Sequence, residues 1–171
     1  MKLVQSVRDF FSDQPKTLQT NFNFVTGKQY KIGINLQLEN VIDSVGFQLW
    51  YPKTIMSPVK VNNALKYDQG DLFAGKPVDM AVNEFTDYYY ISKSLQTGQV
   101  SEAGNKTILK TYFQATNAGT GNIMLKTIKG LKYTTAAPGY TEIPMIYTGD
   151  YTVVFALAGL NYISITVEEV V

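Results

Sequence analysis

The chain has 171 residues, of which 45% are hydrophobic and 17% charged, and its 15 basic side chains nearly balance its 14 acidic ones. A chain of this size and composition folds as one ordinary globular domain. The net charge of +1 is too small for a protein that binds the phosphate backbone of nucleic acids. No stretch approaches the roughly 18 consecutive apolar residues of a transmembrane helix, so we expect no integral membrane protein.

The sequence contains no histidine and no cysteine. Their absence excludes Ser/His/Asp and Cys/His catalysis, structural zinc sites, haem held by histidine, and disulfide bonds. A pair of carboxylates, or a lysine or tyrosine base, could still act in catalysis, but no motif marks one. We therefore expect a protein that is not an enzyme.

The first two predicted strands are separated by a short turn. Residues 18–24 alternate apolar and polar side chains, the sequence Thr26-Gly27-Lys28 supplies a turn, and Gln29 to Leu38 alternates again. This period of two is typical of strands with one buried face, and the two segments predict a β-hairpin. Residues 45–51 predict a third strand with Val45, Phe47, Leu49 and Tyr51 on one face and Gln48 and Trp50 on the other.

The rest of the chain is rich in tyrosine, phenylalanine, valine, isoleucine and threonine, and glycine-containing breaks interrupt it. That composition favours short, half-buried strands. About nine or ten strands with such breaks predict an all-β protein, an antiparallel β-sandwich or jelly roll. The later strands are expected at residues 59–61, 83–92, 107–116, 121–128, 145–147, 151–158 and 162–167.

The N-terminal residues 1–16 differ from the predicted sandwich domain at residues 17–171. Five apolar side chains fall on one face of a helix, but the same segment also fits an extended strand, so its type stays open. Arg8 and Asp9 interrupt any signal-peptide core, and a secretory leader is therefore expected to be absent from this chain. The apolar residues of this arm are Leu3, Val4, Val7, Phe10 and Phe11.

The order of features from residue 28 to about residue 132 resembles the cohesin module of cellulosome scaffolds and related bacterial and archaeal surface proteins. The blocks that carry this resemblance are Lys28-Gln29-Tyr30-Lys31-Ile32, Leu38-Glu39-Asn40-Val41, Val45-Gly46-Phe47-Gln48-Leu49-Trp50-Tyr51-Pro52, Gly70-Asp71-Leu72-Phe73, Gly98-Gln99-Val100-Ser101, Ile108-Leu109-Lys110-Thr111-Tyr112-Phe113-Gln114-Ala115 and Gly121-Asn122-Ile123-Met124-Leu125. The resemblance implies a cohesin-like jelly roll of nine strands, at the cell surface or outside the cell, that holds a dockerin-like protein on one sheet face.

The apolar arm also suggests kinship with extracellular tubes and fibres of the cannula type, whose sandwich subunits polymerise by strand donation. A donated strand covers an exposed sheet edge and inserts alternating apolar side chains. Our preferred expectation from the sequence is a structural protein that forms a filament or tube, in which residues 1–11 complete the sheet of the next subunit. A dockerin-binding receptor and a carbohydrate-binding module are the alternatives.

Three further groups of residues are candidates for ligand sites. Carboxylates in loops suit Ca²⁺, and Asn105-Lys106-Thr107 in a predicted turn is an N-glycosylation sequence with Asn105 as the acceptor. Outward aromatic rings could stack on sugars or anchor a protein partner. The calcium candidates are Asp68, Asp71, Asp79, Glu84 and Asp87, and the candidate ligand face contains Trp50, Tyr88, Tyr89 and Tyr90.

Overall fold

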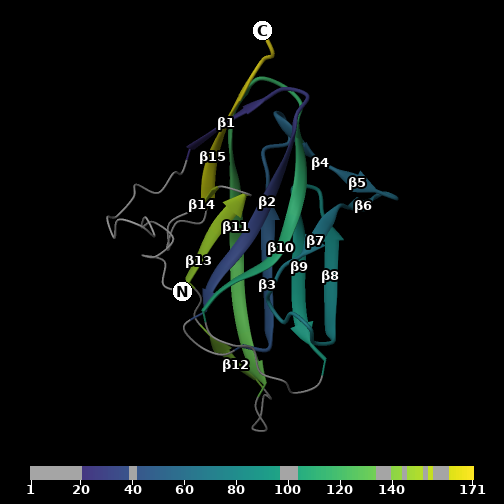
Figure 1. The fold of residues 1–171 in the computed structure, drawn as a ribbon, viewed down its shortest axis with the longest axis vertical. Helices are drawn as coiled ribbons and strands as arrows, with labels where there is room; N and C mark the ends of the chain where they lie inside the picture. The colour runs from purple at the N-terminus through teal and green to yellow at the C-terminus, as the bar shows by residue number, and fades with distance from the viewer. Residues whose placement is uncertain are drawn as a thin grey trace.

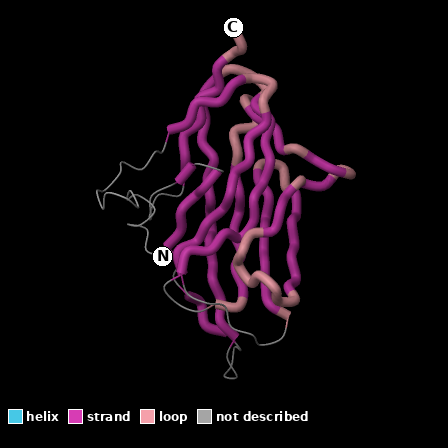
Figure 2. Tube along the Cα trace, viewed as in Figure 1, coloured by secondary structure: helices cyan, strands magenta, loops and turns pink. Residues whose placement is uncertain are grey.

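The computed structural model describes residues 21–38, 42–96, 104–133, 140–143, 146–151, 154–155 and 162–171. All regular structure within these ranges is β-strand, as Figure 2 shows. The described residues include no helix that could cross a membrane. The N-terminal arm and the proposed boundary at residue 16 lie outside the described residues, so both stay predictions.

The strands form two sheets that pack face to face as a β-sandwich (Figure 1). The larger sheet has the order β1-β15-β11-β3-β9-β8, and β12 also pairs with β11. The strands β1 and β15 run parallel, whereas the other neighbours in this sheet are antiparallel. Its strands are β1 (Asn21–Val25), β3 (Ser44–Trp50), β8 (Val78–Glu84), β9 (Tyr88–Leu95), β11 (Gly119–Tyr133), β12 (Tyr140–Ile143) and β15 (Tyr162–Glu168).

The smaller sheet has the order β14-β13-β2-β10-β4, and β7 also pairs with β10. A separate two-stranded hairpin, β5–β6, joins β4 to β7 along the chain and projects from the side of the sandwich (Figure 1). The strands are β2 (Gln29–Leu38), β4 (Met56–Pro58), β5 (Lys60–Val61), β6 (Ala64–Leu65), β7 (Tyr67–Gln69), β10 (Gly104–Ala115), β13 (Ile146–Tyr151) and β14 (Val154–Phe155).

The core lies between the two sheets and is built largely by alternation along the strands, interrupted in β10, where a bulge lets the consecutive residues Ile108 and Leu109 both be buried. The side chains of Val45, Phe47 and Leu49 on β3 are buried, and Ile32 and Ile34 on β2 face them from the other sheet. Burial of such side chains stabilises the fold by about 1.5–3 kcal/mol each. The predicted all-β, cohesin-like sandwich and these inward faces are confirmed.

The predicted hairpin between residues 18–24 and residues 29–38 is wrong. The strand β1 pairs in parallel with β15, while β2 pairs with β10 and β13 in the other sheet. The turn at Gly27, with φ of 81°, therefore leads the chain from one sheet to the other. The ring of Phe24 stacks on Tyr30 across this corner with centroids 3.7 Å apart, so both segments bury apolar side chains without pairing.

The predicted strand at residues 83–92 is also wrong, because the structure forms a hairpin there. The strand β8 ends at Glu84, Phe85 N–H donates to the carbonyl of Tyr88 at 2.8 Å, and β9 begins at Tyr88. The described residues form more strands than the nine or ten predicted, because segments such as β5, β6 and β14 are only two residues long.

Candidate functional site

The outer face of the larger sheet carries the strongest concentration of exposed aromatic side chains. Tyr89 points into the core and is only 1% exposed, whereas its neighbours Tyr88 and Tyr90 point outward. Trp50 lies opposite Tyr88 in the β3–β9 register and shares this outer face. The expectation that the three consecutive tyrosines place rings on both faces of one strand is confirmed, and Tyr89 does not belong to the ligand face.

Two of these outward rings, Tyr88 and Trp50, form a continuous stack with Phe85 that we call the aromatic row. It consists of Phe85, Tyr88 and Trp50. The centroids of Phe85 and Tyr88 are 4.9 Å apart, and those of Tyr88 and Trp50 are also 4.9 Å apart. The ammonium of Lys126 on β11 lies 4.0 Å from the Trp50 ring centre, a cation–π contact that ends the row.

Local backbone structure holds this row in place. The indole N–H of Trp50 donates to the Gln48 side-chain oxygen at 3.0 Å, which fixes the orientation of the ring. The β11–β3 register is continuous up to Lys126 and shifts just beyond it, where Thr127 has a φ of 52°. This bulge interrupts the regular pairing beside Lys126, and the pairing resumes at Lys129; bulges are common near functional side chains.

A second aromatic feature lies beside the row. Tyr90 is 38% exposed, and its hydroxyl end lies over Gly46 of β3, where an added Cβ would approach the hydroxyl oxygen to 2.7 Å. Only glycine leaves room for the ring in this position. The register partners of Tyr90 are Gln48 on β3 and Asn83 on β8, both uncharged.

The remainder of this outer face is mostly polar and has few charged side chains, among them Asp79 on β8 and Glu168 on β15. Most described side chains of β11 and β15 on this face carry amides and hydroxyls, and the Ser164 hydroxyl donates to the Asn122 side chain at 3.1 Å; Met124, opposite Trp50, is apolar. Such a surface, apolar in the row and hydroxyl-rich around it, resembles the core and rim of a protein interface. The polar positions of β11 and β15 are Thr120, Asn122, Ser164 and Thr166.

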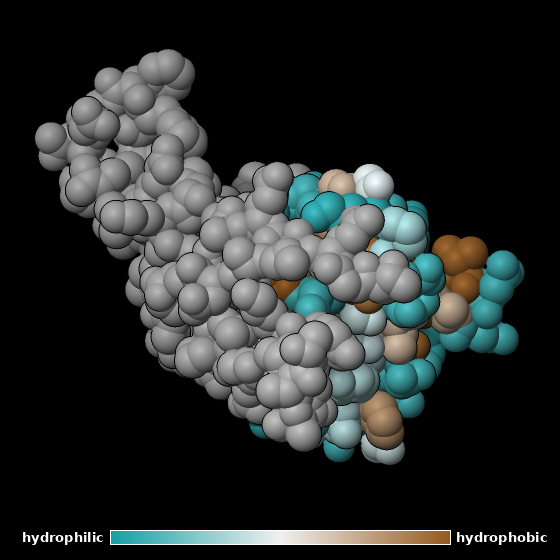
Figure 3. Space-filling model, turned by 90° about the horizontal axis from the view of Figure 1, so that it is seen from below, coloured by the Kyte–Doolittle hydropathy of each residue, from teal (hydrophilic) through white to brown (hydrophobic). Residues whose placement is uncertain are grey.

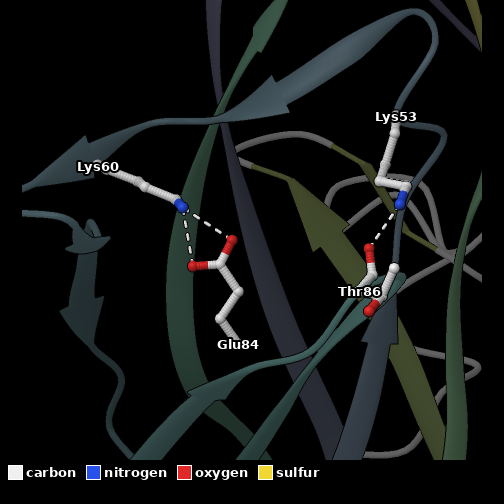
Figure 4. Close-up of polar contacts among 4 residues, drawn as sticks. All are labelled: Lys53, Lys60, Glu84 and Thr86. Atoms are coloured by element: carbon white, nitrogen blue, oxygen red, sulfur yellow. Dashed lines mark hydrogen bonds and ion pairs between the residues drawn. The ribbon is translucent and has the colours of Figure 1, made fainter.

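Two ion pairs connect the β8–β9 turn to other parts of the chain. The Lys60 ammonium on β5 contacts the Glu84 carboxylate at 2.7 Å, and the Lys53 ammonium contacts Asp87 at 2.8 Å. Figure 4 shows Lys60 reaching across to Glu84, and Lys53 donating to the Thr86 carbonyl at 2.5 Å. Both pairs are solvent-exposed, and the paired carboxylate raises the pKa of Lys53.

The interior beneath this turn contains two tyrosines with perturbed acidity. Burial raises the pKa of the Tyr89 hydroxyl, the negative charge of Glu84 adds to the effect, and this oxygen has no hydrogen-bond partner among the described residues. Burial also raises the pKa of Tyr51. Neither hydroxyl is therefore suited to act as a base near neutral pH.

The five carboxylates expected to bind calcium are not brought together. Each bonds to a different neighbour, and the part of the chain that the structure describes contains no group of three or more carboxylates able to hold a metal ion. The expected placement in loops is also wrong for three of them, because Asp68 lies within β7, and Asp79 and Glu84 lie within β8. The partners are Lys31 and Tyr112 for Asp68, the Thr107 N–H for Asp71, Gln96 for Asp79, Lys60 for Glu84 and Lys53 for Asp87.

The smaller sheet carries a different outer face. The Tyr112 ring has the ammonium of Lys66 at 4.3 Å and that of Lys31 at 5.2 Å, and its hydroxyl donates to Asp68. The hydrogen bond from Lys31 holds the pKa of the Asp68 carboxyl below its usual range. These charged groups of the described part of the face are satisfied by one another.

The remaining candidates lie elsewhere. Asn105 was expected in a turn but belongs to β10, where it pairs with Gln37 of β2. Phe85 and Lys126 were not predicted as part of any site. An apolar residue three positions before the tyrosine triplet could have signalled Phe85, whereas Lys126 depends on the pairing of distant strands.

Comparisons with known proteins were made by sequence and by structure. No protein-family model matches the chain, and no curated protein matches it in sequence. Solved structures do match it across 88–90% of its length. They include a non-cellulosomal cohesin from the hyperthermophilic archaeon Archaeoglobus fulgidus, at 13% identity and a TM-score of 0.54, with 88% of that chain covered. The chain has the cohesin fold.

Two bacterial structures agree with this assignment. The seventh ScaB type I cohesin from Pseudobacteroides cellulosolvens matches with a TM-score of 0.58 at 14% identity, and 91% of that chain is covered. The type II cohesin dyad from the adaptor ScaA scaffoldin of Acetivibrio cellulolyticus matches with a TM-score of 0.56 at 13% identity, over 49% of its length. At these identities the likeness establishes the fold and leaves the ligand open.

Proposed function

We propose that this protein is a non-enzymatic interaction module that binds a protein partner of the dockerin type on the outer face of its larger sheet. The observation that carries the proposal is the aromatic row on a face with few charged side chains, in a chain with the cohesin fold. The setting that fits such a module is the cell surface or the extracellular space.

The packing of the row favours a protein ligand over a sugar. Stacking on a sugar needs an open aromatic face. Trp50 has Tyr88 on its β9 side and Lys126 on its β11 side, and Tyr88 is itself stacked between two rings. The row therefore presents ring edges, held in place before binding, and rigid aromatic side chains of this kind serve as binding hot spots at low entropic cost.

A capture experiment tests the proposal. The immobilised protein is exposed to secreted proteins of its host and to a panel of dockerin modules, and each captured protein is purified and titrated by calorimetry. Tyr88→Ala should weaken binding of the partner at least about tenfold, as truncation of an interface hot spot does. Tyr112→Ala, on the outer face of the smaller sheet, is the matched control and should leave the affinity unchanged.

Two results would contradict this function. Equal loss of affinity in the two variants would show that the aromatic row is not the contact surface. Binding to an insoluble polysaccharide that Tyr90→Ala abolishes, without binding to any protein, would favour a carbohydrate-binding module.

Self-assembly through the N-terminal arm is a second proposed function. The apolar side chains of the arm, which include Val7, Phe10 and Phe11, support it. Filaments or tubes of the full chain should be visible by negative-stain microscopy, with and without millimolar calcium, and should be lost in the double variant Val7→Asp/Phe11→Asp. Assemblies that persist in this variant would exclude strand donation by the arm.

A further inference from the structure

The outer edge of β8 is an open sheet edge. β8 is the last strand in the order of the larger sheet and, among the described strands, pairs only with β9. Its seven residues make it long for an edge strand that no other described strand covers. An open edge of this length can pair with another strand.

The hydrogen bonds at its two ends establish which backbone groups point outward. Phe85 N–H donates to the Tyr88 carbonyl, and the Pro77 carbonyl accepts from Gln96 N–H at 3.0 Å, so both residues direct their backbone groups toward β9. Backbone direction alternates along an antiparallel strand. The N–H and C=O groups on the free edge are therefore those of Val78, Met80, Val82 and Glu84.

This edge lacks three common protections against pairing, namely a proline, a lysine and a bulge, and its one inward-facing charge, Glu84, lies at its end. Its register with β9 is continuous. The side chains of Val78, Met80 and Val82 pack against the core yet are only half-buried. Both the backbone and these apolar side chains would gain from a further strand.

We propose that the β8 edge pairs antiparallel with β8 of a second copy of this chain, around a two-fold axis at Ala81. In this register the outward backbone N–H and C=O groups of Met80 pair with those of Val82 of the second copy, and all seven residues of β8 lie opposite the second copy. Asp79 faces Asn83 of the second copy, and Glu84 faces Val78 of the second copy. No like charges are opposed, and apolar side chains meet on the inner face, so the strand is self-complementary.

The β5–β6 hairpin gives this dimer additional contact area. It projects past the β8 edge in Figure 1, and the projection at the same side in Figure 3 carries hydrophobic surface next to hydrophilic surface. Asn62 and Asn63 form its turn with φ values of 51° and 63°, and Val61 is 55% exposed. Lys60 ties the hairpin to Glu84 at the end of β8, which places it beside the second copy.

The dimer does not depend on the proposed partner. It would join two larger sheets edge to edge and present two aromatic rows on one continuous surface, so a partner with two binding modules would be held by avidity. Its failure and the failure of partner binding are separate results, since one concerns the edge of the sheet and the other its face.

Charge substitutions on the two-fold axis test the dimer by sedimentation velocity of the full chain, from micromolar to near-millimolar concentration. The wild-type chain should dimerise, and Ala81→Lys should raise the dimer dissociation constant about fivefold or more, because two lysines then face each other directly. Ser92→Lys is the matched control. Ser92 is the β9 register partner of Ala81, so the same charge is added to the same face one strand away from the axis.

Mixing oppositely charged variants makes the test decisive. Ala81→Lys and Ala81→Glu should each be largely monomeric alone and should dimerise when combined. Circular dichroism of each variant checks that it is folded. A wild-type chain that stays monomeric throughout, equal weakening by Ala81→Lys and Ser92→Lys, or no dimer in the mixture would each overturn the proposal.

Discussion

Replacing Lys93 with methionine should stabilise the folded chain. Lys93 lies on β9 facing the core, its side chain is only 2% exposed, and among the described residues its ammonium makes one long hydrogen bond, to the Ile108 carbonyl at 3.3 Å. Burial lowers the pKa of this ammonium, against a smaller opposing effect of Asp71. Methionine keeps the apolar stem and removes the buried charge, so we expect a gain of about 1–3 kcal/mol at neutral pH.

The gain should depend on pH in a defined direction. In the unfolded chain Lys93 titrates near its ordinary pKa of about 10.4, whereas in the folded chain it releases its proton at lower pH. Wild-type stability therefore rises with pH between these two values, with a slope of at most about 1.4 kcal/mol per pH unit. The advantage of Lys93→Met should be largest below the folded pKa and smallest above about pH 10.4.

Urea unfolding followed by circular dichroism at pH 6 to 10 measures this difference. Lys110→Met, on the outward side of β10, is the matched control and should change stability by less than about 0.5 kcal/mol. A loss of stability in Lys93→Met at all pH values would refute the reasoning, because it would mean that the buried ammonium is fully compensated by its surroundings.

Five other changes should separate steric, conformational and polar contributions, each measured as the free energy of unfolding in urea. Gly70→Ala should cost about 2–3 kcal/mol, because its Cβ would lie 2.0 Å from a backbone oxygen of β10. Gly27→Ala, in open space at positive φ, should cost only about 1 kcal/mol. Equal costs would contradict the distinction between a steric clash and backbone strain. Tyr89→Phe removes a buried hydroxyl that has no partner among the described residues, and it should be neutral or stabilise by up to about 1 kcal/mol. Tyr30→Phe loses the hydrogen bond from a β1 N–H at 2.8 Å and should cost about 1 kcal/mol. The reverse order would refute the assignment of these hydrogen bonds. Lys60→Ala should cost less than about 0.5 kcal/mol, with the difference vanishing in high salt, since the pair is exposed.

The inward faces of the strands could be predicted because alternation is a local property. Val45, Phe47 and Leu49 are buried as their spacing indicates, and the tyrosine triplet is split between the two faces as expected. Pairing is not local. The segments around Gly27 have the same apolar pattern whether they form a hairpin or pass from one sheet to the other, and only the distant β15 decides between the two.

In the candidate site, too, the local features could be predicted from the sequence and the non-local ones could not. Trp50 and Tyr88 could be singled out as outward aromatics, but the row needs Phe85 in a turn that the sequence pattern missed and Lys126 on a strand whose register shifts immediately after it. The acidic residues look like a cluster along the chain. Strand geometry separates them, since Asp79 points to the outer face of β8 and Glu84 to the side of the second sheet.

The central claim is that a protein partner covers the aromatic row, and the chain carries its own reporter for it. Trp50 is the only tryptophan in the sequence and lies in the row. Acrylamide quenching of its fluorescence should be measured with and without a purified partner that lacks tryptophan, at saturation verified by sedimentation. The quenching constant of Trp50 should fall clearly on binding, because the partner covers the ring. Saturated binding with unchanged quenching would place the partner on another surface and contradict the account.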